Sequence, residues 1–206
     1  MNDIISRYPQ LKMCKNDVDR ALKALIDCYE NGGKLLLCGN GGSAADCDHI
    51  VGELMKGFLL KRPLSEEKRA KMKNKLPSLD EDALNKLQMG LPAISLSSIS
   101  ALNTAFCNDV DADLVYAQSL LALASERDCL FAISTSGNSK NVIHAVKVAK
   151  ALDLRVIGLS GIGGGLLSEL CDICIRVPEC ETYKVQELHL PIYHYLCAKV
   201  EDHFFG

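Results

Sequence analysis

Four hydroxyl side chains fall within six residues in the segment from Ser134 to Ser139, directly after the apolar run from Cys129 to Ile133. The hydroxyls belong to Ser134, Thr135, Ser136 and Ser139. Hydroxyls donate hydrogen bonds to phosphate oxygens, and Gly137 lets the backbone approach a ligand closely. The helix expected from Asn138 directs its free N–H groups and the positive end of its dipole toward the same place. A serine-rich turn that only caps a helix has a similar composition, but hydroxyls clustered after a buried strand favour a phosphate-binding site.

A glycine-rich segment, Gly39 to Ser43, follows another short apolar run, Lys34 to Cys38. Its spacing differs from the G-x-G-x-x-G pattern of dinucleotide-binding loops, and no lysine follows the glycines as in a P-loop. Taken alone, this segment indicates only a turn from a strand into a helix.

Two pairs of polar residues have spacings that place their members on one side of a helix. His49 and Glu53 are four residues apart, so both can reach one ion or one substrate. Gln186 and His194 are eight residues apart, with His189 between them. Such pairs are more often solvated or structural than functional, so spacing alone leaves their role open.

The elements that must position these residues form an alternating pattern. Short apolar runs predict strands at Lys34 to Cys38, Ala93 to Leu96, Cys129 to Ile133, Arg155 to Leu159 and Ile173 to Val177. Strands that alternate with helices predict an α/β fold, with a central parallel sheet flanked by helices on both faces. In such sheets ligands bind outside the carboxyl ends of the strands, where the two polar loops lie.

Helical spacing of apolar residues predicts long helices at both ends of the chain. The first is expected from Ile4 to Tyr29 and the closing helix from Thr182 to Phe205. Ser43 is expected to cap a helix that runs to about Phe58. The charged segment from Arg62 to Gln88 contains prolines and is expected to form a short helix or two in an extended connection.

Composition limits the class of protein. The 206 residues are 48% hydrophobic, which suits a single domain spanning residues 1–206, with 62–90 as a variable connection. A net charge of -3 argues against nucleic acid or an anionic membrane as the main partner. No apolar stretch has the length of a membrane span, and we expect a cytoplasmic protein. The ten cysteines are expected to be reduced, with Cys171 and Cys174 as packing residues.

Considered together, four blocks resemble the phosphoheptose isomerases of the sugar isomerase (SIS) domain family. They are Cys38 to Ser43, His49 with Glu53, Ile133 to Asn141, and Gln186 to His194. Their order and spacing match along nearly the whole chain, apart from the connection at Arg62 to Gln88. The serine-rich block is typical of SIS domains in general, whereas the narrower resemblance depends on His49, Glu53, Gln186 and His194.

The resemblance implies an enzyme, typically a homotetramer, that converts sedoheptulose 7-phosphate into a heptose 7-phosphate aldose through an enediol. Glu53 and His194 match the acid/base pair of the family. One zinc ion per subunit is implied at His49, Glu53, Gln186 and His194. Substrate contacts are implied from Asn40, Gly41, Gly42, Asn108, Asp109, Ser134, Thr135, Ser136, Ser139 and Gln186. The expected partners are a phosphorylated sugar and further copies of the chain.

Related SIS domains also serve as phosphosugar-sensing regulators or as adaptors in replication initiation, without catalysis. These relatives keep the phosphate site and tend to lose the acid/base and metal set. All four positions of that set are filled here, which favours the enzyme. The stretch from Leu96 to Ser100 departs from the family pattern near the expected sugar-binding rim, so the exact sugar stays open.

Overall fold

The computed structural model describes residues 1 and 4–206 together with their side chains. Its centre is a parallel sheet in the order β2-β1-β3-β4-β5. The strands are β1 (Leu35–Cys38), β2 (Ala93–Ser95), β3 (Cys129–Ile133), β4 (Arg155–Ser160) and β5 (Ile173–Arg176). The predicted parallel α/β architecture is confirmed.

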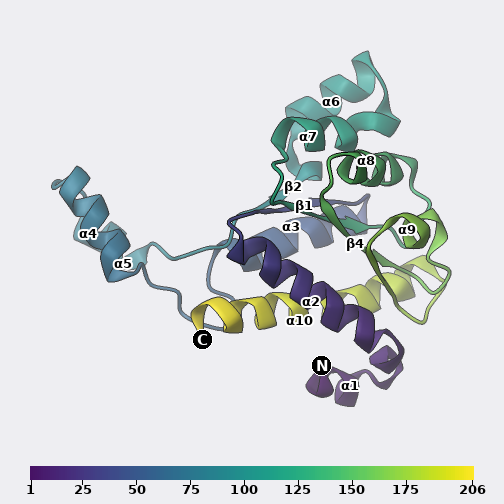
Figure 1. Cartoon of the computed structure of the whole chain (residues 1–206), viewed down its shortest axis with the longest axis horizontal. Coiled ribbons are helices and arrows are strands. Elements are labelled where there is room, and N and C mark those ends of the chain that lie inside the picture. Colours follow the sequence, from purple (N-terminus) through teal and green to yellow (C-terminus); the bar gives the residue numbers. More distant parts are fainter.

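Helices cover both faces of this sheet (Figure 1). α2 (Lys15–Glu30), α3 (Gly42–Met55) and α10 (Thr182–Phe205) bury one face, and α7 (Val115–Leu123), α8 (Lys140–Ala151) and α9 (Gly165–Leu170) bury the other. In β1, Leu35 and Leu37 join the first core, whereas Leu36 and Cys38 join the second. This alternation follows from the two-residue period of a strand, and it explains why the run is apolar throughout.

The prediction of one long first helix is wrong. The chain forms α1 (Asn2–Arg7), a 3₁₀ segment (Pro9–Cys14) and then α2. Tyr8 has φ -131° and ψ 74°, outside the helical region. The following Pro9 disfavours the helical conformation at Tyr8 and has no N–H to donate, so the helix is interrupted there.

Two further local differences concern helix boundaries. Ser43 is not a helix cap, because α3 begins at Gly42 and its N-cap residue is Gly41. The helices α6 (Ser100–Asp109) and α7 were not predicted from the sequence. The closing helix runs from Thr182 to Phe205 as predicted and packs against α2 and α3.

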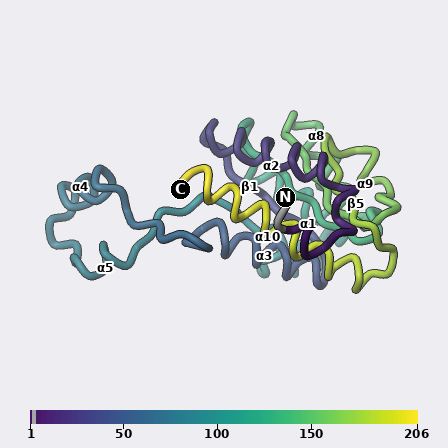
Figure 2. Tube along the Cα trace, turned by 90° about the horizontal axis from the view of Figure 1, so that it is seen from below, coloured from purple at the N-terminus to yellow at the C-terminus, as the bar shows by residue number. Residues whose placement is uncertain are grey.

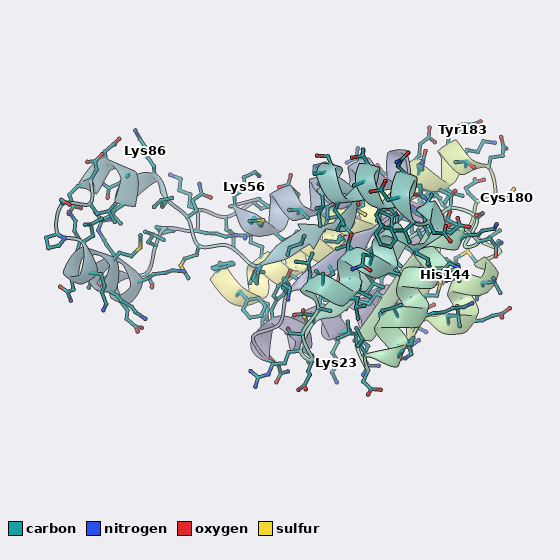
Figure 3. The ribbon with its side chains drawn as sticks, turned by 90° about the horizontal axis from the view of Figure 1, so that it is seen from above. Lys23, Lys56, Lys86, His144, Cys180 and Tyr183 are labelled. Atoms are coloured by element: carbon teal, nitrogen blue, oxygen red, sulfur yellow. The ribbon has the colours of Figure 1, made fainter. Side chains whose placement is uncertain are left out.

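The segment between α3 and β2 extends away from the body as an arm that carries α4 (Glu66–Lys75) and α5 (Glu81–Lys86) (Figure 2). The prediction of short helices in an extended connection is therefore confirmed. An antiparallel bridge between Pro63 and Gln88 closes the base of the arm. Figure 3 shows Lys86 on the arm, well away from Lys56 at the end of α3.

All ten cysteines are free thiols in the structure, including Cys171 and Cys174. Within residues 1 and 4–206, no helix is both long enough and apolar enough to cross a membrane.

Candidate active site

A pocket of about 330 Å³ opens at the carboxyl ends of β1 and β3, where the two polar loops meet the start of α10. Its lining consists of Asn40, Gly41, Gly42, Ser43, Ile133, Ser134, Thr135, Ser139, Thr182 and Gln186. This location agrees with the rule that ligands bind outside the carboxyl ends of parallel strands. The pocket therefore brings together the glycine-rich and the serine-rich loops, which are about ninety residues apart along the chain.

The serine-rich loop is held in a tight turn at the start of α8. The N–H of Gly137 donates to the carbonyl of Ser134, and the Oγ atoms of Ser134 and Ser139 are 3.0 Å apart. Gly137 has φ +69°, and a Cβ at this position would lie 1.9 Å from the carbonyl oxygen of Gly164. Only glycine fits here, because both the backbone conformation and the space exclude a side chain.

The two loops are joined by side-chain hydrogen bonds. Asn40 Nδ2 donates to Asn141 Oδ1 at 2.8 Å, and Asn141 Nδ2 donates to Asn40 Oδ1 at 3.0 Å. The hydroxyl of Tyr116 donates to the carbonyl of Gly39 at 2.7 Å. These contacts fix the relative position of both walls of the pocket. The roles of Tyr116 and Asn141 were not predicted, because Tyr116 belongs to no recognisable spacing pattern and Asn141 entered only as the last residue of the serine-rich block.

Gln186 extends from α10 to the glycine-rich loop. A Cβ at Gly42 would lie 2.5 Å from Gln186 Nε2, so the side-chain amide lies directly against Gly42. A residue larger than glycine at position 42 would displace it. The predicted substrate contacts Asn40, Gly41, Gly42, Ser134, Thr135, Ser139 and Gln186 all line this one pocket.

Three predicted substrate contacts lie elsewhere. Ser136 is exposed, and its Oγ accepts a hydrogen bond from the N–H of Asn138. Asn108 and Asp109 are exposed at the end of α6, where the Asn108 amide donates to the Asp109 carboxylate. None of the three belongs to the pocket lining in the described part of the chain.

The predicted acid/base residues meet where α10 packs against α3. His49 Nε2 lies 3.2 Å from Glu53 Oε1 and 3.5 Å from His194 Nε2. The one-turn spacing of His49 and Glu53 puts them on the same face of α3, and α10 supplies His194 from the opposite side. Glu53 and His194, which can both exchange protons, therefore each lie within contact distance of His49.

The surroundings adjust the basicity of this cluster. Burial lowers the pKa of His194, the neighbouring His49 lowers it further, and Glu53 acts in the opposite direction. The imidazole of His194 is accordingly neutral near pH 7 and able to accept a proton. The side chain of Glu53 is only 13% exposed, and its second oxygen lies 3.2 Å from Lys56 Nζ. His189, which is not part of this cluster, is fully buried. Burial lowers its pKa to about 4, and the Ser160 backbone acts in the opposite direction.

The same residues can be tested against a metal ion. Tetrahedral zinc with bonds of about 2.0–2.1 Å separates its ligand atoms by about 3.3 Å. The two contacts of His49 Nε2, at 3.2 Å and 3.5 Å, are close to this value, and imidazole and carboxylate are suitable donors. Within residues 1 and 4–206, however, no group of three or more His, Cys, Asp or Glu side chains is already arranged to hold a metal ion. Zinc stays a prediction.

The chain is similar to known proteins over most of its length. The model of the SIS domain family matches residues 2–88 and 83–161. The phosphoheptose isomerase of Aneurinibacillus thermoaerophilus is 37% identical over 91% of this chain and 82% of its own length. The corresponding protein of Helicobacter hepaticus is 40% identical over 90% of this chain and 81% of its own length. The solved phosphoheptose isomerase of Francisella tularensis superposes with a TM-score of 0.74 and 31% identity, covering 98% of this chain and 97% of that structure.

Proposed function

The chain belongs to the SIS domain family, in its phosphoheptose isomerase branch, and we propose that it interconverts sedoheptulose 7-phosphate and D-glycero-D-manno-heptose 7-phosphate. It is a phosphosugar isomerase. The observation that carries the proposal is the pairing of a hydroxyl-lined pocket with an acid/base cluster on the helices next to it.

The pocket binds the phosphate end of the sugar. Ser134, Thr135 and Ser139 supply hydroxyl donors, and the first turn of α8 adds backbone N–H groups and the positive end of its dipole. Gln186 and Asn40 line the same pocket and offer amide groups to the sugar hydroxyls. A fixed phosphate converts binding energy into orientation of the reacting carbons.

Isomerisation moves one proton between two adjacent carbons. Glu53 removes the proton from C1 of the ketose, and the C2 carbonyl oxygen gains a proton, which gives the enediol. Glu53 then returns its proton to C2, while the hydroxyl on C1 loses its proton and becomes the aldehyde. Neutral His194 carries the proton between the two oxygens. The protons and electrons of the reaction balance without an oxidant or reductant.

We also propose that His49, Glu53, Gln186 and His194 hold one zinc ion per subunit. Zinc bound there would polarise the carbonyl and hydroxyl oxygens of the sugar. The donor types and the two contact distances of His49 support this proposal. Zinc analysis of protein purified without chelator tests it, and full activity in chelator by zinc-free protein would reject it.

We further propose that the enzyme is a homotetramer. A groove of about 690 Å³ between α1, the segment after α3 and α10 contains His194 and the exposed side chains of Leu59 and Leu190. Apolar side chains exposed beside an active site support the expected homotetramer. Light scattering that gives only the 22.4 kDa chain mass would contradict it. We place the enzyme in the cytoplasm, where free thiols persist.

Proton exchange tests the activity itself. Wild-type protein in deuterium oxide should incorporate deuterium into sedoheptulose 7-phosphate, because the carbon-bound proton passes through Glu53. Glu53→Gln should keep phosphosugar binding and lose turnover by about two to four orders of magnitude. Wild-type protein that exchanges no proton on any ketose phosphate, yet binds these sugars, would instead support a regulator or adaptor.

A further inference from the structure

Tyr193 lies between the acid/base cluster and a carboxylate that the proposed reaction does not use. It is 1% exposed, and its hydroxyl donates to Asp46 Oδ1 at 3.1 Å. The same hydroxyl oxygen lies 3.1 Å from His49 Nδ1. Asp46 and His49 lie on α3 and Tyr193 on α10, so the contact forms only when the two helices pack.

The tyrosine hydroxyl has one proton to donate, and its surroundings decide where this proton goes. Asp46 Oδ2 is buried and finds no hydrogen-bond partner among the described residues. If Tyr193 donated to His49 instead, Asp46 Oδ1 would lose its donor as well, and the carboxylate would be left without any. Buried polar atoms are rarely left in that state. The proton therefore lies toward Asp46, and the hydroxyl oxygen accepts a hydrogen bond from His49 Nδ1–H.

This direction determines the protonation of the other ring nitrogen. A neutral imidazole carries one N–H, so a proton on Nδ1 leaves a lone pair on Nε2. Nε2 lies 3.2 Å from Glu53 Oε1 and 3.5 Å from His194 Nε2, so a proton or a metal ion between these atoms must occupy that lone pair, because two acceptor atoms repel each other at this distance. Nε2 of His49 is thus prepared to accept a proton from the cluster or to bind a metal ion.

We propose that Tyr193 and Asp46 are positioning residues that hold the His49 ring through a hydrogen bond at Nδ1 and direct its Nε2 at Glu53 and His194. The proposal rests on the proposed function only in one respect, because that function makes His49, Glu53 and His194 part of the active site. The hydrogen-bond argument applies to the protein without substrate or metal.

The chain offers a matched control for removing the Tyr193 hydroxyl. Tyr29 is also buried, and its hydroxyl has no hydrogen-bond partner within residues 1 and 4–206. Tyr29→Phe and Tyr193→Phe each delete one buried hydroxyl from the same apolar core. Only the second removes the partner of His49.

The first measurement is the protonation of His49 by ¹⁵N NMR on metal-free, histidine-labelled protein at about pH 8, where imidazoles are largely neutral. His49→Gln assigns the signal. Wild-type protein and Tyr29→Phe should show the proton on Nδ1, whereas Tyr193→Phe and Asp46→Asn should shift the population toward Nε2–H. A wild-type spectrum in which Nδ1 of His49 carries no proton, or an unchanged spectrum in folded Tyr193→Phe, would overturn the proposal.

The second measurement is zinc affinity by calorimetry without substrate. Tyr193→Phe should bind zinc about 10–100-fold more weakly, the usual effect of losing a hydrogen bond behind a ligand, and Tyr29→Phe should match wild type. Equal affinity in all three proteins would contradict the positioning role. Wild-type protein that binds no zinc would reject the proposed metal alone, because the NMR result still decides the protonation of His49.

Discussion

Arg62 and Glu201 form an ion pair of 2.7 Å in which neither side chain is exposed to solvent. The carboxylate of Glu201 also accepts the N–H groups of Phe58, Leu59 and Leu60. The guanidinium of Arg62 also donates to the carbonyls of Leu54 and Glu53 at the end of α3. The pair therefore joins the start of the arm and the end of α3 to α10.

Removing one member of this pair should destabilise the protein strongly. Glu201→Gln leaves the Arg62 charge buried without a counter-charge, which costs about 3–5 kcal/mol in comparable cases. The free energy of unfolding in denaturant measures the loss. Lys86→Met is the control, because Lys86 pairs with Asp82 on the exposed surface of α5 and should change stability by less than about 1 kcal/mol. Equal losses in both variants would contradict the account.

Glu201 also predicts a pH dependence of stability. Burial alone would raise the pKa of Glu201, but the N–H groups of Phe58 and Leu59 and the Arg62 guanidinium outweigh it and hold the pKa below its ordinary value of 4.5. A carboxyl group with a lowered folded pKa stabilises the fold above its unfolded pKa and loses this effect as the pH falls through the folded pKa. The difference in unfolding free energy between wild type and Glu201→Gln should therefore be constant near pH 7 and shrink below about pH 4.5. A difference that grows toward acid pH would refute it.

The hydroxyls of the serine-rich loop should differ in their importance. Ser139 lines the pocket, whereas Ser136 is exposed outside it. Ser139→Ala should weaken phosphosugar binding by about tenfold or more, because a hydrogen bond to a charged group contributes about 1.5–3 kcal/mol. Ser136→Ala should have a smaller effect. Calorimetry measures both affinities, either with a sugar phosphate that is not turned over or in the Glu53→Gln variant. A larger loss of affinity in Ser136→Ala than in Ser139→Ala would show that the pocket is assigned incorrectly.

The tight turn of this loop depends on Gly137. Gly137→Ala places a Cβ against the carbonyl oxygen of Gly164 at a positive φ, so the loop must move and phosphosugar binding should be lost. Gly52→Ala is the matched control, since Gly52 lies within α3 and a Cβ there meets nothing within 4 Å. That variant should gain up to about 1 kcal/mol of stability. Retained binding in Gly137→Ala would refute the steric argument.

The sequence predicted the sheet because the strands are short apolar runs, most of which end in glycine or small polar residues. It also predicted most of the pocket, since the carboxyl ends of parallel strands meet at one edge. It could not predict the contact of Tyr193 with His49 and Asp46, which depends on how α10 packs against α3. Nor could it predict the contact of Tyr116 with Gly39, which depends on how α7 packs against the loop after β1.

The remaining differences between the predictions and the structure also have physical causes. Pro9 was present in the sequence, but the helical spacing of apolar residues on either side obscured the break at Tyr8. Asn108 and Asp109 were assigned by resemblance alone, and α6 places them outside the pocket lining. Ser43 suggested a cap by its type, whereas the turn at Gly41 starts α3 without a side-chain cap.

The arm should be dispensable for folding. Neither hydrophobic core contains a residue from α4 or α5 within the described part of the chain. Pro63 and Gln88 already pair in antiparallel register at its base, so a two-residue Asn-Gly turn can replace residues 64–87. Because Arg62 and Glu201 stay in place, the shortened protein should melt within a few degrees of wild type and bind phosphosugar equally well.

Thermal unfolding, calorimetry and the deuterium-exchange assay test this together. A shortened protein that folds and binds phosphosugar but exchanges no deuterium would show that the arm contributes to catalysis. As a control, residues 64–87 are inserted back into the shortened gene. This variant tests whether the cloning junctions themselves change the protein.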